Sequence, residues 1–346
     1  MSTLPARYAP MLASPMGTLP DALSDWAIEP KWDGIRVIAE VTERGARLWT
    51  RNGNDKAPQF PEIVGALTKL AARDGPMVLD GEIVALDAKG GALRFQALQG
   101  RVHAVREATT TRNAEERAAF VAFDLLSDAG RQITALPWTE RRKALEARVP
   151  ARRAALVRRG ESVRCGTVAA KKLFERARTE HWEGVLLKRV DASYSAGRRT
   201  PDWRKVKLER EQEFVIGGFT APTKGAARDH LGALLVGYFD GDQLHYAGKV
   251  GTGYTQQMLG LLAGKLAPLR RRTSPFADAP RTGLGVVTWV KPVLVAQVRY
   301  NEITDAGILR QPIFLGLRDD KDARDVRLEE TSGAASAIIS GLRCAS

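Results

Sequence analysis

The stretch Glu29-Pro30-Lys31-Trp32-Asp33-Gly34-Ile35-Arg36 decides how the rest of the chain is organised. It places a lysine between two carboxylates, follows it with a glycine that allows a tight turn, and leads into an apolar strand. A free lysine side chain has a pKa of about 10.4, so few molecules carry the neutral amine near neutral pH. A nucleophilic Lys31 would therefore need desolvation or nearby cations that lower its pKa. Taken alone, the stretch is equally typical of a surface turn with mixed charges.

Length and composition indicate a globular protein with more than one domain. The chain has 346 residues, 44% hydrophobic and 27% charged, which is enough for two domains with separate cores. Its 53 Lys and Arg against 40 Asp and Glu give a net charge of +13. This surplus favours a polyanionic partner, because each neutralised phosphate releases counterions. An arginine-rich proteome bias would have the same effect on the charge.

The rarer residues exclude several kinds of site. Cys165 and Cys344 lie far apart and the four histidines are scattered, so we expect no zinc site, disulfide framework or Cys-His catalytic pair. Gly251-Thr252-Gly253 lacks the Lys-Ser/Thr ending of a phosphate loop and is interpreted as a turn. No apolar run of about eighteen residues and no secretion signal is present. We therefore expect a cytoplasmic protein that does not associate with membranes.

Apolar patterning predicts a mixed helix and strand domain up to about Leu208. Residues 43–45 would turn the first two strands into a hairpin that holds Lys31 near one end. Residues 1–26 are expected to pack over this domain, and residues 92–118 to be polar and helical with a charged loop. The expected strands are 35–41, 46–50, 77–87, 120–126 and 185–189, and the expected helices are 61–73, 138–147 and 169–181.

Several of these elements carry polar residues where apolar ones would be expected. Asp80-Gly81-Glu82 interrupts an apolar strand, where two carboxylates are costly unless paired or bound to metal. A β-bulge with a solvated Glu82 is the alternative. Lys205 and Lys207 lie two apart in a strand and so face the same side, where they repel each other unless an anion lies between them. A solvated strand face is the alternative there.

Three further stretches of this domain are candidates for function. Arg51 follows a predicted strand end, which is a good place for a functional arginine. Phe123 precedes an aspartate in a strand and, as a single residue, is more typical of a core position than of base stacking. Residues 194–201 form a basic loop with glycine and proline, which leads into the strand of Lys205 and Lys207.

The composition changes after Leu208. We interpret Glu209–Glu213 as a charged interdomain linker with a hinge near Leu208–Glu213. Residues 330–346 turn small and apolar and are expected to form a loose terminal helix. Between them, short strands are expected at 214–219, 234–238, 244–250, 286–290 and 294–300, with one helix near 255–266. Five strands with one helix are typical of a small oligonucleotide-binding barrel.

Taken in order and spacing, these stretches resemble the motif series of the covalent nucleotidyltransferases. The resemblance spans about residues 6–325 and looks closest to the ATP-dependent DNA ligases of bacterial end joining, the ligase C and ligase D group. It is carried by Glu29–Arg36, Arg51–Gly53, Asp80–Glu82, Phe123-Asp124, Glu183-Gly184, Gly197–Arg199, Trp203–Lys207, Arg299–Glu302, Gly307–Pro312 and Phe314–Lys321.

The resemblance implies an α+β protein. An adenylation (nucleotidyltransferase) domain of antiparallel sheets with flanking helices would span residues 1–208, an OB-fold β-barrel 209–330, and a C-terminal tail 331–346. It also implies an ATP-dependent DNA ligase that seals 5′-phosphate/3′-hydroxyl breaks in duplex DNA, in non-homologous end joining or a related repair process. The implied partners are nicked or broken DNA and, as an open question, Ku. A monomer in the bacterial cytoplasm or nucleoid is expected.

The resemblance also assigns roles to residues. Lys31 would form a lysyl–AMP intermediate, with Lys205 and Lys207 gripping the α-phosphate as further catalytic residues. Glu82 and Glu183 would hold Mg²⁺ or Mn²⁺. The other nucleotide contacts would be Glu29 and the backbone of Pro30 at the adenine edge, Phe123 on its face, Arg36 near the ribose with Glu82, Arg51 near the nucleotide, and Arg318 and Lys321 at the pyrophosphate. The DNA contacts would be Arg51, Arg198 and Arg199.

The expected pKa of Lys31 depends on the metal. Lys205, Lys207 and a metal ion would lower this pKa, whereas Glu82 and Glu183 would raise it unless the metal neutralises them. The chain departs from the family pattern at Gln311, where many relatives have histidine. We expect neither the fused polymerase and phosphoesterase domains of many ligase D proteins nor the zinc finger, helix-hairpin-helix and NAD-recognising N-terminal domains of bacterial NAD ligases. The lack of the NAD-recognising domain favours ATP over NAD. An RNA ligase, a GTP-dependent capping enzyme and a non-catalytic DNA-end-binding protein remain as alternatives.

Overall fold

The computed structural model describes two compact units, divided between Glu209 and Arg210. The described residues are 8–329 except 17–19, 21, 88–89, 94, 103–116, 181, 209, 223–230 and 280–282. Lys31 lies in the first unit, and the second unit begins at Arg210. Each unit has hydrophobic clusters of its own. Within the described residues, no helix is long and apolar enough to cross a membrane.

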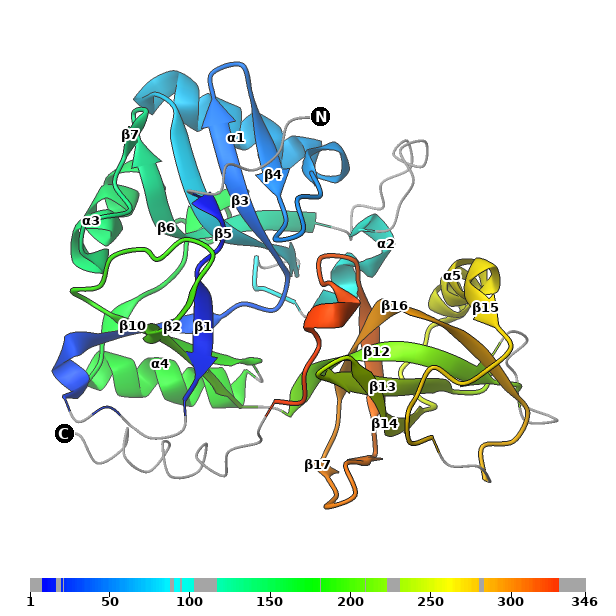
Figure 1. The fold of residues 1–346 in the computed structure, drawn as a ribbon. Helices are drawn as coiled ribbons and strands as arrows, with labels where there is room; N and C mark the ends of the chain where they lie inside the picture. The colour runs from blue at the N-terminus through cyan, green and yellow to red at the C-terminus, as the bar shows by residue number, and fades with distance from the viewer. Residues whose placement is uncertain are drawn as a thin grey trace. The chain divides into compact units, whose positions relative to one another are not determined.

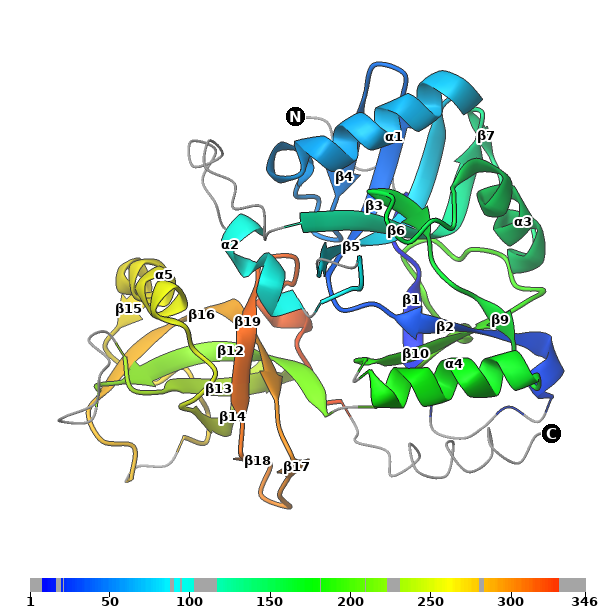
Figure 2. The ribbon, with the colours of Figure 1, turned by 180° about the vertical axis from the view of Figure 1, so that it is seen from behind.

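The first unit contains a five-stranded sheet that carries Lys31. Helix α4 (Val168–Thr179) runs along one face of this sheet (Figure 1, Figure 2), where Leu173 and Phe174 pack against Ile28 and Val185. The opposite face is therefore available for polar side chains. In spatial order the strands are β1 (Leu12–Pro15), β11 (Arg199–Lys207), β10 (Gly184–Arg189), β2 (Trp26–Lys31) and β9 (Val163–Arg164), antiparallel except for the β1–β11 pair.

A second sheet of the same unit carries the predicted carboxylates. Helices α1 (Pro61–Asp74) and α3 (Trp138–Arg148) contribute Ile63, Leu67 and Leu145 to its core. Helix α1 begins at Pro61, which suits a first helical turn because proline lacks an N–H. The strands in order are β4 (Gly45–Trp49), β3 (Ile35–Thr42), β5 (Met77–Leu86), β6 (Arg117–Asp128) and β7 (Arg131–Gln132), with β8 (Val157–Arg159) parallel to β6.

Short helical turns connect these elements. They are η2 (Leu23–Asp25), η3 (Ala57–Gln59), η4 (Phe95–Leu98) and α2 (Gln99–Val102). The helical prediction for residues 92–118 is thus confirmed only for 95–102. The charged loop predicted there falls largely on residues 103–116, which lie outside the described part of the chain.

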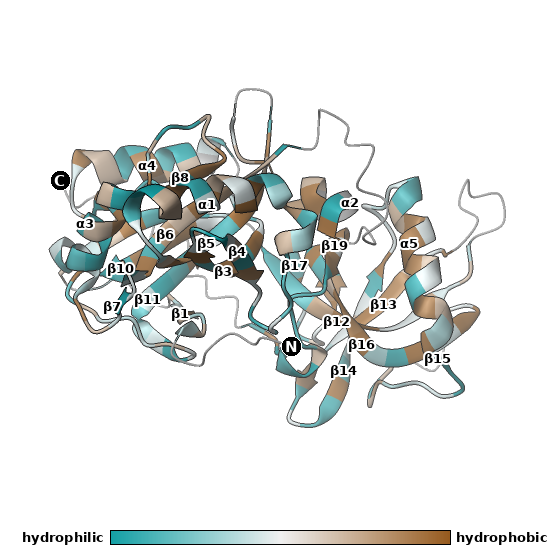
Figure 3. Cartoon of the chain, turned by 90° about the horizontal axis from the view of Figure 1, so that it is seen from above, coloured by the Kyte–Doolittle hydropathy of each residue, from teal (hydrophilic) through white to brown (hydrophobic). Residues whose placement is uncertain are grey.

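Within its described residues, the second unit has a six-stranded sheet, a two-stranded sheet and one α-helix, as expected for the OB-like barrel. Helix α5 (Gln256–Leu266) is capped by Thr255, whose hydroxyl accepts the Met258 N–H at 3.2 Å. Hydrophobic and polar residues alternate around α5 (Figure 3), and Leu259 and Leu262 are buried. The strands are β14 (Gln243–Val250), β13 (Leu234–Asp240), β12 (Glu211–Thr220), β16 (Val287–Arg299), β15 (Arg270–Arg271), β19 (Ile313–Arg318), β17 (Glu302–Ile303) and β18 (Leu309–Arg310), with turns η5 (Ala267–Leu269) and η6 (Ala323–Asp325).

The linker prediction is wrong for residues 211–213. Strand β12 begins at Glu211, which is 1% exposed and lies opposite Arg299 of β16. Its neighbour Gln212 is also buried. The side-chain amide of Gln212 donates to Arg327 O at 2.9 Å and accepts the Glu329 N–H at 2.9 Å, so its polar atoms are satisfied without water. Hydrogen-bonding partners thus let a charged, polar segment enter a sheet. A hinge in this region is restricted to residues before Glu211.

Three other predictions needed correction. The strands predicted at 286–290 and 294–300 are one strand, β16, because Val290 and Val295 are both buried along the same partner β12. Strands β1 and β2 were missed, since the polar residues of β2 break its apolar run. Strand β5 runs through Asp80–Glu82 without interruption, with the partner register shifting beside Gly81. The predicted helix at 330–346 lies outside the described residues.

Candidate active site

Two rows of residues bring the basic side chains together on the face of the sheet opposite α4. Strand β10 lies between β2 and β11, and residues in register on neighbouring strands share a face. Glu29 and Lys31 of β2 therefore share this face with Lys205 and Lys207 of β11. The first row is Lys31, Gly184 and Lys207, and the second row is Glu29, Leu186 and Lys205.

Two glycines make this arrangement possible through close packing. A Cβ on Gly184 would lie 2.1 Å from Val206 O, so only glycine lets β10 and β11 approach between Lys31 and Lys207. A Cβ on Gly34 would lie 2.1 Å from Ile83 O and 3.0 Å from the Glu82 side chain. Gly34 has no left-handed backbone conformation. Gly34 is therefore required because the chain enters β3 in close contact with the backbone of β5 at Ile83, and the predicted turn geometry is not the reason.

Lys31 forms an ion pair with Glu183, the residue before β10. Their side chains are 23% and 7% exposed, respectively. Burial lowers the pKa of Lys31, and the charge of Lys207 lowers it further. Glu183 and, more weakly, Glu82 raise this pKa. Their combined effect is larger, so the pKa of Lys31 lies above its usual value. Without metal or nucleotide, Lys31 is thus a protonated amine, as the carboxylates alone predicted. Chemistry at Lys31 requires that Glu183 releases it.

Glu82 and Glu183 are also the candidate metal ligands. Both lie near enough to Lys31 to raise its pKa. Among the described residues, no group of three or more His, Cys, Asp or Glu side chains could hold a metal ion. Mg²⁺ is commonly bound by one or two carboxylates, with waters and substrate phosphates completing the shell. The donor set therefore fits a metal ion that is held jointly with a phosphorylated substrate.

Lys188 belongs to this site and was missed by the sequence analysis. It is fully buried, with its Nζ 2.7 Å from Glu29 Oε2 and 3.3 Å from Phe123 O. The other oxygen, Glu29 Oε1, is buried and has no hydrogen-bonding partner within the described structure. Strand alternation offered a signal, because Lys188 lies two residues after Leu186 and so faces the same side. The pair leaves one buried acceptor atom ready for a donor.

Phe123 lies next to this pair with most of its surface covered. It is 6% exposed and packs edge-on against Trp203, with ring centres 6.3 Å apart. Lys188 Nζ lies 4.6 Å and Arg36 Cζ 5.5 Å from the centre of its ring. Phe123 is therefore a core residue that borders the Glu29–Lys188 pair. A base stacked here would contact only a small part of the ring unless the side chain moved.

Arg36 is held by Asp80. Its Nε lies 3.0 Å from Asp80 Oδ1 and its Nη2 lies 2.6 Å from Asp80 Oδ2, while its side chain remains 24% exposed. Burial acts to lower the pKa of Arg36, but Asp80 outweighs it and raises this pKa further. Asp80 itself is fully buried. Asp80 is thus the counterion that orients Arg36, which confirms the prediction that a carboxylate in this apolar strand would be paired.

The remaining predicted residues are Arg51, Arg198, Arg199, Arg318 and Lys321. Arg51 is exposed in the turn after β4, and Arg198 is exposed before β11. Arg199 donates to Ala13 O of β1. In the second unit, Arg318 binds Asp320 through two contacts of 2.8 Å, and Lys321 Nζ lies 3.2 Å from Glu213 Oε1. Arg318 and Lys321 belong to the second unit, as do Asp320 and Glu213.

Gln311 has a structural explanation. It has a φ of 48°, an uncommon conformation for a residue with a side chain, and its Oε1 accepts from the amide of Asn301. It therefore supports the turn between β18 and β19 of the second unit.

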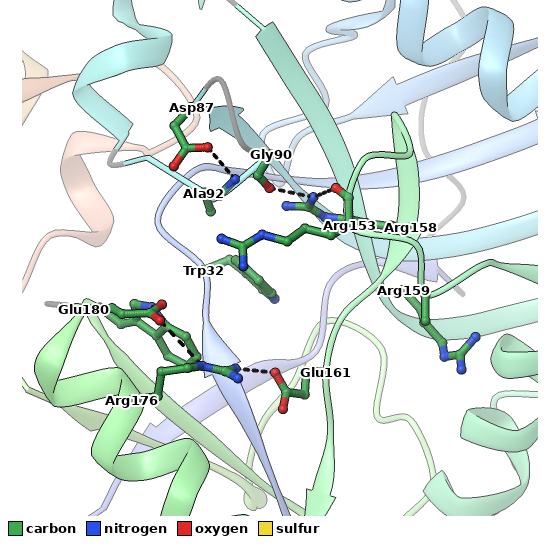
Figure 4. Close-up of a pocket in the computed structure, with 13 residues that line it drawn as sticks. Trp32, Asp87, Gly90, Ala92, Arg153, Arg158, Arg159, Glu161, Arg176 and Glu180 are labelled. Atoms are coloured by element: carbon green, nitrogen blue, oxygen red, sulfur yellow. Dashed lines mark hydrogen bonds and ion pairs between the residues drawn. The ribbon is translucent and has the colours of Figure 1, made fainter.

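A separate pocket of about 450 Å³ lies beside Trp32. Figure 4 shows Arg153 extending over Trp32, with the Arg176–Glu161 ion pair on the other side. Arg158 donates to Gly90 O at 2.9 Å and so supports the backbone at the edge of the pocket. None of the residues assigned to the nucleotide lines this pocket.

Comparison with known families agrees with this geometry. Residues 10–207 match the family model described as "ATP dependent DNA ligase domain". Residues 227–321 match that described as "ATP dependent DNA ligase C terminal region". The two matched segments lie on either side of the division between the two units.

Individual relatives point to the same family. The chain is 38% identical over 334 residues to the "Multifunctional non-homologous end joining protein LigD" of Pseudomonas aeruginosa, covering 95% of this chain and 38% of that protein. It is 38% identical over 319 residues to the corresponding protein of Mycobacterium tuberculosis, covering 92% and 39%. The chain thus spans about two fifths of the length of these curated relatives.

A solved structure covers nearly the whole chain. The structure described as "mycobacterial DNA ligase D complexed with ATP and MES" superposes with a TM-score of 0.67 at 37% identity, covering 94% of this chain and 99% of that one. On the combined strength of the matched family models, the relatives and the fold, the chain belongs to the family of ATP-dependent DNA ligases.

Proposed function

We propose that this chain seals 5′-phosphate/3′-hydroxyl breaks in duplex DNA through a lysyl–AMP intermediate on Lys31. The observation that carries the proposal is the row Lys31, Gly184 and Lys207, with Glu183 paired to Lys31 at its end. A nucleophilic amine, a second cation and a carboxylate thereby lie on one sheet face. The three steps are adenylylation of Lys31, transfer of AMP to the 5′-phosphate, and attack of the 3′-hydroxyl with release of AMP.

In the first step, the amine of Lys31 attacks the α-phosphorus of ATP and pyrophosphate leaves. The amine must first lose its proton, which requires that its pairing with Glu183 weakens, because that pairing holds the Lys31 pKa up. Lys205 and Lys207 would bind the α-phosphate oxygens, where negative charge must be stabilised in phosphoryl transfer. Arg318 and Lys321 of the second unit would orient the pyrophosphate.

Glu82 and Glu183 would hold the divalent metal. The ion supplies positive charge that neutralises phosphate oxygens and offsets the two carboxylates, which favours the unprotonated form of Lys31.

The buried acceptor on Glu29 supports adenine over guanine. Glu29 Oε1 has no partner in the described structure, while Lys188 occupies Oε2. An adenine amino group could donate to this oxygen, whereas the carbonyl oxygen at the same position of guanine is another acceptor and would repel it. The backbone of Pro30, which lies opposite Val185, would contribute to the same edge. Phe123 would contact the base face, and Arg36 and Glu82 the ribose.

The DNA contacts follow from charge. Exposed Arg51, Arg198 and Arg199, and the net charge of +13, would bind phosphates without reading sequence. The relatives named for non-homologous end joining suggest repair of broken ends as the setting. A monomer in the bacterial cytoplasm or nucleoid, with Ku as a candidate recruiting partner, completes the proposal.

The test is transfer of label from α-³²P ATP to the protein, followed by sealing of a nicked duplex. The wild-type chain should take up label and seal the nick, and Lys31→Ala should do neither. Lys69→Ala, which alters an exposed lysine of α1, is the matched control and should behave like wild type. Sealing by Lys31→Ala at the wild-type rate would show that another residue is the nucleophile.

Parallel incubations separate the rival functions. Labelling by GTP alone would indicate a capping-type enzyme, and a strong preference for nicked RNA would indicate an RNA ligase. Comparison of nicked and broken duplexes, each with and without Ku, tests the setting in end joining.

A further inference from the structure

Tyr194 lies in the basic loop that precedes β11, and its hydroxyl reaches the carboxylate that holds Arg36. The side chain is 5% exposed. Its hydroxyl donates to Asp80 Oδ2 at 2.7 Å and accepts the Met11 N–H at 2.9 Å. Met11 immediately precedes β1. One phenol group thus joins β5, the start of β1 and the loop before β11.

Asp80 has its hydrogen-bonding capacity largely filled by two residues. Arg36 donates to both carboxylate oxygens, and Tyr194 donates to one of them. The Arg36 contacts use Nε and Nη2, and Nη1 makes no hydrogen bond to any described residue. Removal of the Tyr194 hydroxyl would leave Asp80 held by Arg36 alone, so that the carboxylate and the guanidinium could shift together.

Tyr194 is itself held firmly in place. Its N–H donates to Thr134 O at 2.8 Å. Arg141 of α3 donates to Ala192 O at 3.0 Å and grips Asp124 of β6 through contacts of 2.8 and 2.9 Å. Arg141 also lies 5.8 Å from the centre of the Tyr194 ring. The loop is therefore anchored to α3 and β6, and the hydroxyl has a defined position.

The hydroxyl remains a donor over the whole useful pH range. Burial and the neighbouring charge of Asp80 raise the pKa of Tyr194 well above its usual value, against the weaker opposing effect of Arg36. The phenol is thus protonated wherever the enzyme is active.

We infer that Tyr194 is a positioning residue for nucleotide binding, which acts through Asp80 to orient the free edge of Arg36. The inference rests on the proposed function, in which Arg36 lies near the ribose of ATP. It also gives the segment before β1 a role, since Met11 shares the same hydroxyl. Tyr194 itself need not touch the substrate.

Tyr194→Phe tests this, because it removes only the hydroxyl. ATP affinity is measured by calorimetry without divalent metal, and lysine labelling in single turnovers over a range of ATP concentrations. We expect the dissociation constant and the half-saturating concentration to rise about five- to tenfold, since a hydrogen bond to a charged group is lost. The maximal labelling rate should change less than about twofold, because no group at the reacting phosphorus is altered.

A double-mutant cycle separates positioning from a general structural effect. Lysine cannot form the two-point contact that arginine makes with Asp80, so Tyr194→Phe should have no further effect on ATP affinity in an Arg36→Lys background. Tyr246→Phe removes the hydroxyl of another buried tyrosine, in the second unit, and is the matched control that should leave ATP affinity unchanged.

The possible results are distinct. Unchanged affinity in Tyr194→Phe, or an equal loss in the Arg36→Lys background, overturns the positioning role. A wild-type chain that binds ATP but takes no label contradicts the proposed function, while the binding data still decide the role of Tyr194. A wild-type chain that does not bind ATP overturns both.

Discussion

Lys31 and Glu183 form an ion pair that must open before the amine can react. The pairing keeps Lys31 protonated, and metal or nucleotide binding would compete with Lys31 for Glu183. Since the folded-state pKa of Lys31 is raised, the pair stabilises the fold fully below the unfolded pKa of lysine, and that contribution is lost as pH rises through the folded value. In the proposed reaction, the same carboxylate would thus keep Lys31 unreactive at rest and would later help to bind the metal ion.

Glu183→Gln should lower the pKa of Lys31 in the metal-free protein. The substitution removes the strongest influence that raises this pKa and leaves burial and Lys207, which lower it. The measurement is an NMR titration of ¹³C-methylated lysines, with Lys31→Arg used to assign the signal. Glu140→Gln, on the exposed first turn of α3, should not move it. An unchanged Lys31 titration in Glu183→Gln would contradict the ion pair.

The buried pair of Glu29 and Lys188 has a different role, because neither charge can reach water. Pairs of this kind seldom add stability over apolar residues, but the loss of one partner is costly. Here the pair keeps Glu29 oriented with Oε1 available. The arrangement suits specificity for a base better than it suits stability.

Lys188→Met should lower the free energy of unfolding by about 3–5 kcal/mol, because Glu29 is left as an uncompensated buried charge. Glu29→Gln added to Lys188→Met should restore a large part of that loss, since it removes the charge. Urea denaturation measures both. If the single and double variants were equally unstable, packing around Lys188 would matter and the charge would not.

At the scale of elements, close contact between backbones sets the geometry of the site. Gly184 lets β10 and β11 pair where a side chain would clash with Val206 O, and Gly34 lets the start of β3 lie close to the backbone of β5 at Ile83. The charged residues are therefore brought together by strands whose own packing is apolar, through α4 on the far face. The sheet determines the spacing of Lys31 and Lys207.

Gly184→Ala should destabilise the first unit by about 1–3 kcal/mol and reduce lysine labelling, because the added methyl group forces β10 and β11 apart. Gly65→Ala is the matched control. It lies in α1 with open space around it, so it should stabilise by about 0.5–1 kcal/mol and leave labelling unchanged. Thermal unfolding and the labelling assay measure the two effects. Normal labelling by Gly184→Ala would show that the row tolerates a wider spacing.

At the scale of the whole molecule, the proposed reaction divides its residues between two units. The adenosine and α-phosphate residues lie in the first unit, and the proposed pyrophosphate residues Arg318 and Lys321 lie in the second. A need for Arg318 and Lys321 should therefore be confined to the step that releases pyrophosphate. Substitution of Arg318 is a poor test of this role, because it would leave the buried carboxylate of Asp320 without its counterion.

Lys321→Ala is the better probe. Lys321 is 30% exposed and pairs with a partly exposed Glu213, so the pair contributes about 0–1 kcal/mol to stability. Labelling of Lys31 by ATP should fall about tenfold or more, because a cation that faces the leaving group is lost. Sealing of a nick that already carries AMP should stay at the wild-type rate, and Lys265→Ala of α5 should affect neither. Equal loss in both assays would contradict a role confined to pyrophosphate.

Much of the fold could be predicted from sequence where a segment is patterned by its own periodicity. Helices α1, α3, α4 and α5 and the β3–β4 hairpin have apolar spacing that local geometry explains. Strand β2 was missed because the polar residues it carries into the site interrupt its pattern. The start of β12 was missed because buried polar residues looked like a solvated linker. In both cases, the buried polar side chains are paired or hydrogen-bonded by residues distant in sequence, which a local pattern does not show.

The sequence by itself determined the α+β class and the motif order, and it predicted Lys31, Glu82, Glu183, Lys205 and Lys207 as a set through the resemblance of these motifs to the covalent nucleotidyltransferases. Spacing along one strand explains only why Lys205 and Lys207 share a face. Only the tertiary structure decided that Lys31 is paired with Glu183, that Lys188 leaves one oxygen of Glu29 free, and that Asp80 and Tyr194 hold Arg36. These contacts join residues 44 to 159 positions apart. The pKa values and orientations of charged groups depend on the distances between such residues, and these distances exist only once the two sheets have folded together.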